Sequence, residues 1–173
     1  MQAIEVYSIL KKQYPKSKIA LNHSNPLELL IAVMLSAQCT DIRVNIVTKN
    51  LFAKYQTIEE YANSDIDELK KIIRSAGFYN NKAKNIINTC KIIIDKHNGL
   101  VPKTMDELVF LPGVARKTAN IVLSNAFNIT KGIAIDTHMK RINFRLNLTK
   151  NIDPNKIEQD LIKQLPQNLW NKY

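Results

Sequence analysis

Apolar residues recur at helical spacing along most of the chain. The apolar run from Leu29 to Leu35 is flanked by further helical pattern, so it predicts a buried helix, and positions from Asp41 to about Tyr55 predict a second one. Residues 80–98 form the longest helical stretch. Only residues 132–135 could pass for a strand, and such a short isolated segment cannot make a sheet. The pattern therefore predicts an all-α fold of roughly nine or ten helices joined by short turns.

Capping residues indicate where these helices begin and end. Asn25-Pro26 and Asp153-Pro154 each combine an N-cap side chain with proline at the first helical position. Thr104, followed by Glu107, forms a capping box, and Ser64 precedes a helix with acids in its first turn and bases in its last. Gly77 is expected to stop that helix in a left-handed cap, and Gly99 to close the longest one.

Composition limits the function classes. The chain has 173 residues, 45% of them hydrophobic, which suits one domain or two small lobes and argues against global disorder. Neither a long apolar run nor a signal-peptide pattern is present, so we expect no membrane partner and a cytoplasmic location. The two cysteines, Cys39 and Cys90, are too few for a disulfide framework or a four-thiolate metal site. The net charge of +10 favours a polyanionic partner.

The most informative segment runs from Leu108 to Asp136. A short helix ends, Leu111-Pro112-Gly113-Val114-Ala115 makes a tight turn, and a second helix begins at about Arg116. Such a turn can direct backbone N–H groups toward a phosphate beside the positive end of the second helix. An ordinary helix–helix corner is the alternative interpretation of the turn alone. Residues 111–150 carry seven basic residues and one acidic residue, Asp136, and this concentration of charge favours the phosphate-binding interpretation.

Two residues of this segment suggest catalysis. Lys117 lies in the first turn of the second helix, where the helix dipole and Arg116 should disfavour its protonation and make the amine nucleophilic. A solvated surface lysine is the alternative. Asp136 is the lone acid among these cations, and its alternative role is a helix N-cap. An amine and a carboxylate in one basic cleft suggest imine chemistry on a sugar aldehyde, although sequence reasoning alone does not bring the two groups together.

In this hairpin segment and in three others, the chain resembles the endonuclease III family of DNA glycosylases, within the helix-hairpin-helix–Gly/Pro–Asp superfamily. The matching segments, in the family's order and spacing, are LELLIAVMLSAQCTD (27–41), AGFYNNKAKNIINTC (76–90), HNGLVPKTMDELVFLPGVARKTAN (97–120) and IAIDTHMKRI (133–142). The resemblance implies a two-lobed all-α fold. Residues 21–130 would form a six-helix barrel ending in a helix-hairpin-helix at about 104–127, while residues 1–20 and 131–173 would form the second lobe.

The resemblance also implies a bifunctional enzyme that acts as a monomer on double-stranded DNA. It would excise oxidised pyrimidines and cleave the strand 3′ to the abasic site by β-elimination. Lys117 would be the nucleophile that forms a Schiff base, and Asp136 would stabilise positive charge on the sugar. Gln38 would fill the gap left by the extruded base and Phe78 would be an intercalating wedge, while a helix-end polar residue and a core aromatic are their alternative roles. The residues 113–116 (Gly113, Val114, Ala115 and Arg116) would contact DNA, and His138 matches a motif position with no assigned role.

Three departures from the family pattern qualify this interpretation. Ala115 replaces the second glycine of the usual hairpin, and one extra residue lies between the hairpin helix and Asp136. The family's His-Gly-Arg segment and its four iron–sulfur cysteines would follow Tyr173, so we expect no cluster, no other cofactor or metal and a shortened second lobe. A DNA-binding protein without catalysis is therefore the alternative function, and the bacterial-type enzyme would be associated with the nucleoid.

Overall fold

The computed structural model describes residues 2–173, and none of them lies in a β-strand. Its α-helices are α1 (Ala3–Gln13), α2 (Pro26–Ser36), α3 (Asp41–Lys54), α4 (Ile58–Ala62), α5 (Ile66–Ile73), α6 (Tyr79–His97), α7 (Met105–Phe110), α8 (Arg116–Phe127), α9 (Thr137–Arg145) and α10 (Pro154–Ile162). Two short 3-10 helices, η1 (Arg74–Ala76) and η2 (Gln167–Leu169), complete the described elements. The all-α prediction is confirmed, and the segment 132–135 is not a strand. No helix in residues 2–173 combines the length and the apolar character needed to cross a bilayer.

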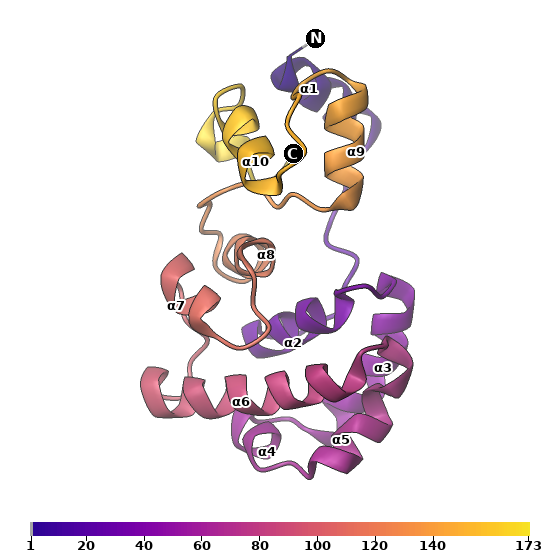
Figure 1. The fold of residues 1–173 in the computed structure, drawn as a ribbon, viewed down its shortest axis with the longest axis vertical. Helices are drawn as coiled ribbons and strands as arrows, with labels where there is room; N and C mark the ends of the chain where they lie inside the picture. Colours follow the sequence, from indigo (N-terminus) through magenta and orange to yellow (C-terminus); the bar gives the residue numbers. More distant parts are fainter. Residues whose placement is uncertain (1) are drawn as a thin grey trace.

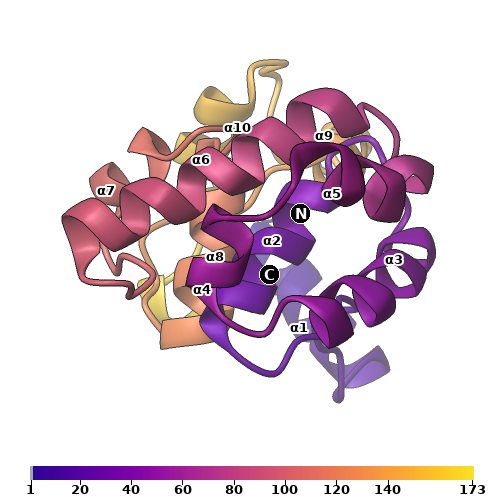
Figure 2. The same cartoon turned by 90° about the horizontal axis from the view of Figure 1, so that it is seen from below.

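The helices gather into two groups (Figure 1). Helices α2 to α8 form the larger group, and α1, from the start of the chain, lies beside α9 and α10 from its end. Seen from below, α2 is enclosed by the other helices of the larger group (Figure 2). This position explains why every residue from Leu29 to Leu35 is buried, and why this helix is apolar all round rather than amphipathic.

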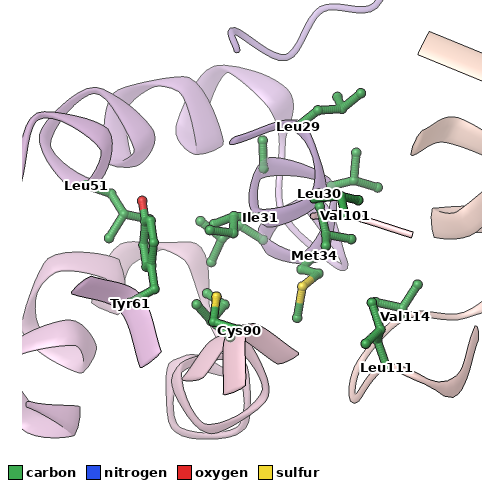
Figure 3. Packing of buried hydrophobic residues seen from close by; sticks show 14 of the residues in the cluster. Leu29, Leu30, Ile31, Met34, Leu51, Tyr61, Cys90, Val101, Leu111 and Val114 are labelled. Atoms are coloured by element: carbon green, nitrogen blue, oxygen red, sulfur yellow. The ribbon is translucent and has the colours of Figure 1, made fainter. Parts of the chain in front are cut away.

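The core of the larger group connects the central helix to the hairpin. Ile31 and Met34 of α2 lie near Cys90 of α6 (Figure 3), and all three side chains belong to one buried cluster. Leu111 and Val114, from the turn between α7 and α8, are buried in the same cluster. Because two of the five turn residues contribute to this core, the turn is anchored to the barrel of helices rather than suspended from its two helix ends.

A second, separate cluster joins the two ends of the chain. Ala3, Val6 and Tyr7 of α1 are buried with Ile157 and Leu161 of α10. The backbone N–H of Ala3 also donates to the Gln164 side chain at 3.1 Å. The N-terminal helix thus packs against the C-terminal part of the described chain. The lobe boundaries proposed from the sequence, near residues 20 and 130, stay a prediction.

Most helix starts lie where the capping pattern places them. The side chains of Asn25, Thr104 and Asp153 accept backbone N–H groups from Glu28, Glu107 and Lys156. One predicted start was displaced by a residue, because Asp65, not Ser64, caps α5 by accepting the Glu68 N–H at 2.8 Å. The carboxylate outcompetes the neighbouring hydroxyl, which instead donates to Tyr61 O.

The predicted glycine stops were only partly right. Helix α5 ends at Ile73 and continues as η1, so Gly77, with φ of +69° and ψ of 158°, is not a left-handed helical cap. The left-handed residue is the next one, Phe78, with φ of 47°. Helix α6 is likewise capped by Asn98 in the left-handed conformation, directly before Gly99. Asparagine tolerates this conformation better than other side chains, which explains the one-residue displacement.

Candidate active site

The turn between α7 and α8 is held from its inner side. The Thr89 hydroxyl of α6 donates to Pro112 O at 3.0 Å, and the Val114 N–H donates to Leu111 O at 3.1 Å. Gly113 has φ of +77°, and a Cβ built there would lie 2.7 Å from the Asn85 Nδ2 atom. Glycine is therefore required both by the backbone conformation and by the approach of α6. Of the predicted DNA contacts, Gly113 is exposed, whereas the Val114 side chain is buried and supports the turn.

Ala115, which replaces the usual glycine, is the N-cap residue of α8. Its φ of −86° and ψ of 168° are ordinary extended values, so an L-residue is accommodated without strain. No side chain caps this helix end. Ala115 and the first residues of α8 are exposed, so the positive end of the helix dipole faces solvent. An uncapped helix N-terminus of this kind is suited to binding a phosphate.

Lys117 and Asp136 are brought together by the fold. The Lys117 Nζ atom of α8 lies 3.8 Å from the Asp136 Oδ2 atom, and the two side chains are 45% and 34% exposed. Asp136 is also the N-cap of α9, because its Oδ1 atom accepts the Met139 N–H at 2.8 Å. The separation is too long for a direct hydrogen bond, so the amine stays free to approach another atom. The carboxylate thus fills the capping role while facing the amine.

Arg116 does not lie where the charge count suggested. Its Nε atom donates to Glu158 Oε2 at 2.7 Å, and its second guanidinium nitrogen donates to Oε1 at 3.3 Å. The ion pair raises the pKa of the Arg116 guanidinium. The Arg116 side chain is therefore held against α10, and its charge is paired with a carboxylate outside the basic segment. The expectation that its charge acts on Lys117 is correspondingly weakened, since the guanidinium field is largely cancelled.

Glu158 is a buried residue that supports the site and that sequence reasoning missed. It is 2% exposed and accepts, besides Arg116, the Asn120 amide at 3.2 Å and the Ile133 N–H at 3.0 Å. A Cβ on Gly132 would lie 1.9 Å from Glu158 Oε1, so glycine is needed there for the carboxylate to enter. The Glu158 network joins α8, which carries Lys117, to the segment that leads into Asp136. No sequence signal distinguishes Glu158 from the other acids of the C-terminal region.

Gln38 and Phe78 both project from loops at the ends of helices. Gln38 follows α2 and Phe78 precedes α6; both are exposed, Phe78 at 66%. Both also have positive φ values, 54° and 47°, which are unusual for residues other than glycine. The alternative role of Phe78 as a core aromatic is therefore wrong, because its ring lies outside the core. His138 is exposed, and its Nδ1 atom lies 3.3 Å from a guanidinium nitrogen of Arg141 on the same helix.

The described residues do not form the family's iron–sulfur site. Cys90 is fully buried in the larger core cluster and Cys39 packs against it. Burial raises the pKa of the Cys90 thiol to about 12, which opposes the thiolate form that a metal needs. Among residues 2–173, no group of three or more His, Cys, Asp or Glu side chains is placed to hold a metal ion.

Comparison with known proteins places this geometry in a family. Residues 31–167 match the family model of the HhH-GPD superfamily base excision DNA repair proteins. Endonuclease III of Synechocystis sp. is 49% identical over 172 residues, which cover 99% of this chain and 78% of the relative. Endonuclease III of Bacillus subtilis is 48% identical over 158 residues, or 91% of this chain and 72% of the relative.

Solved structures agree. A non-covalent endonuclease III–DNA complex has a TM-score of 0.94 at 46% identity, covering 98% of this chain and 79% of the other. A trapped endonuclease III–DNA covalent intermediate gives the same values. The resemblance, the fold and the expectation of a DNA glycosylase with AP lyase activity are thereby confirmed. The chain belongs to the endonuclease III family, within the HhH-GPD superfamily of base excision DNA repair proteins.

Proposed function

We propose that this protein acts as a monomer on double-stranded DNA, excises oxidised pyrimidines and cleaves the strand 3′ to the abasic site. The observation that carries the proposal is the pairing of Lys117 Nζ with Asp136 Oδ2 at 3.8 Å beside an uncapped helix N-terminus. An exposed amine, a carboxylate and a phosphate-binding helix end are the groups that Schiff-base chemistry on a DNA sugar requires.

Each catalytic group has a defined role in this chemistry. The Lys117 amine attacks the sugar C1′ atom as the C1′–N bond breaks; the damaged base leaves with the electron pair of that bond and takes up the proton that Nζ loses. Asp136 stabilises the positive charge that develops on the sugar during this step. Ring opening gives a Schiff base between Nζ and C1′. Loss of a proton from C2′ then forms a C2′=C3′ double bond as the C3′–O bond breaks and the 3′ phosphate leaves, and hydrolysis of the imine releases Lys117.

The hairpin turn, Gln38 and Phe78 serve DNA binding and base extrusion, while the Arg116 side chain is held by Glu158. The turn around Gly113 and the first N–H groups of α8 bind a backbone phosphate. Gln38 and Phe78 fill the space that the extruded nucleotide leaves, which offsets the cost of unstacking it. Their exposure and their position at helix ends are consistent with both roles. The covalent DNA complex formed by a relative 46% identical to this chain also supports the proposal.

Borohydride trapping tests the catalytic assignment. The protein is incubated with duplex DNA that contains one abasic site, and sodium borohydride reduces any imine to a stable covalent adduct. We expect trapping by the wild type and none by Lys117→Gln. Lys91→Gln is the matched control, because Lys91 is an exposed lysine of α6 outside the basic segment 111–150. Duplexes carrying thymine glycol, 8-oxoguanine or no lesion then test the substrate class.

Three outcomes would contradict parts of the proposal. Equal trapping by the wild type and Lys117→Gln would exclude Lys117 as the nucleophile. Duplex binding by a wild type that neither traps nor excises would favour the non-catalytic DNA-binding alternative. Excision of 8-oxoguanine in preference to thymine glycol would overturn the pyrimidine assignment while leaving the lyase chemistry intact.

A further inference from the structure

Lys82 of α6 is a buried lysine whose ammonium group bonds to backbone oxygens. The residue is 7% exposed, and its Nζ atom donates to Leu35 O, Ala37 O and Ala76 O, each at 2.8 Å. An ammonium has three N–H donors, so this arrangement satisfies all of them. Burial lowers the pKa of Lys82, and the three carbonyl oxygens replace the water that the buried charge has lost.

The three oxygens come from two segments that are far apart in the sequence. Leu35 and Ala37 lie at the C-terminal end of α2, and Ala76 is the last residue of η1. Carbonyl groups at helix ends lack intrahelical partners and carry the negative end of the helix dipole, so a cation is favoured there. Lys82 therefore joins two helix ends through one point charge.

These two segments carry the two residues proposed to replace the extruded base. Gln38 directly follows Ala37, and Phe78 lies two residues after Ala76. Both residues hold left-handed backbone conformations, with φ of 54° and 47°, and both are exposed. Such conformations are strained in non-glycine residues and persist only where the surrounding structure imposes them. Because these exposed side chains have no core packing to impose their conformation, the constraint must act through the adjacent backbone.

We infer that Lys82 is a positioning residue for base extrusion, whose ammonium fixes the loops of Gln38 and Phe78 relative to each other. The inference rests on the proposed function, in which these two side chains enter the duplex together. Base extrusion is easiest when both side chains are already in position before the nucleotide leaves the stack. A loop that first has to become ordered loses conformational entropy, and this loss adds to the free-energy cost of unstacking. Lys82 would remove this cost without touching DNA.

The test compares Lys82→Met with Lys91→Met, an exposed lysine on the same helix whose loss changes the net charge equally. Extrusion is followed by the fluorescence of 2-aminopurine placed beside the lesion, and excision by single-turnover kinetics on duplex DNA. Borohydride trapping on single-stranded abasic DNA is the third measurement, because that substrate needs no extrusion. Melting temperatures establish that each variant is folded at the assay temperature.

We expect Lys82→Met to lower the rates of extrusion and excision on duplex DNA by about tenfold or more, while trapping on single-stranded DNA changes less than about twofold. Lys91→Met should match the wild type in all three measurements. In a background of Gln38→Gly and Phe78→Gly, Lys82→Met should cause little further loss, because neighbouring residues that act together are not additive. If Lys82→Met does not fold, Lys82→Gln, which keeps two donors, should show the same selective loss at smaller magnitude.

Other results would overturn the inference. Wild-type excision by a folded Lys82→Met protein would show that the loops need no ammonium. Equal losses on duplex and single-stranded DNA, or full additivity with the Gln38 and Phe78 substitutions, would indicate a general structural role. A wild-type protein without excision or trapping would instead refute the proposed function, and the inference with it.

Discussion

The Asp136 carboxylate uses its two oxygens for two different purposes. Oδ2 lies 3.8 Å from Lys117 Nζ, and Oδ1 accepts the Met139 N–H at 2.8 Å as the N-cap of α9. The two interpretations that the sequence leaves open, helix cap and partner of the amine, are therefore compatible. Capping fixes the rotation of the carboxylate, and the second oxygen faces the amine as a consequence.

Substitution of Asp136 should separate the two purposes. Asn is as good an N-cap as Asp but carries no charge, so Asp136→Asn should melt near the wild-type temperature and slow base excision by about 10²-fold or more. Asp136→Ala should lose the cap as well and destabilise the fold by a further ~1 kcal/mol. Thermal melts and single-turnover excision check both. Wild-type excision by Asp136→Asn would show that the charge is not used.

The two small residues of the hairpin turn should respond in opposite ways. Gly113→Ala places a methyl group against Asn85 at a φ of +77°, so we expect a loss of about 1–3 kcal/mol and weaker duplex binding. Ala115→Gly should leave stability nearly unchanged or slightly higher, because Gly is the better N-cap and the backbone there is ordinary. Binding to a duplex, measured by fluorescence anisotropy at fixed salt, and chemical denaturation are the measurements. Equal tolerance of the two substitutions would contradict the assigned turn geometry.

Phe78 offers a case in which stability and activity should change independently. Its ring is 66% exposed and its φ is 47°, so Phe78→Gly removes little packing and relieves backbone strain. Greater freedom of the unfolded chain offsets part of that gain, and we expect a melting temperature close to that of the wild type. Excision from duplex DNA should fall, whereas Phe78→Leu, which keeps apolar bulk, should retain it. A large loss of stability in Phe78→Gly would indicate that the ring packs against the protein.

The Glu158 network should matter for stability more than any single surface ion pair. Glu158→Ala leaves the buried Ile133 N–H and Asn120 amide without their acceptor and removes the ion pair with Arg116, so we expect destabilisation of about 1–3 kcal/mol. Gln159→Ala, at an exposed neighbouring position, is the control. Gly132→Ala should destabilise through the same carboxylate, because its Cβ would collide with Glu158 Oε1. The losses in free energy of unfolding caused by Glu158→Ala and Gly132→Ala should therefore not add up in the double mutant, which chemical denaturation of all three proteins measures.

Local chemistry made much of the fold predictable. The side chains of Asn25, Thr104 and Asp153 accept N–H groups only three residues further along the chain, so these caps form independently of how the helices pack. The bounds of the hairpin turn follow in the same way from Pro112 and Gly113. The capping residue of α5 lies one position later than predicted, because the Asp65 carboxylate is a better acceptor than the Ser64 hydroxyl.

Spacing and residue type act over one or two helical turns, so they were enough to predict the helices, the hairpin and the candidate roles of Lys117 and Asp136. The packing of distant segments brings Arg116 to Glu158, 42 positions away, and Lys82 to backbone oxygens up to 47 positions away. A charged group binds whichever partner the packing of helices brings within about 3 Å, and no local pattern encodes that choice. The approach of Lys117 to Asp136 also depends on tertiary contacts, because Glu158 of α10 binds both Arg116 beside Lys117 and the Ile133 N–H in the segment that leads into Asp136.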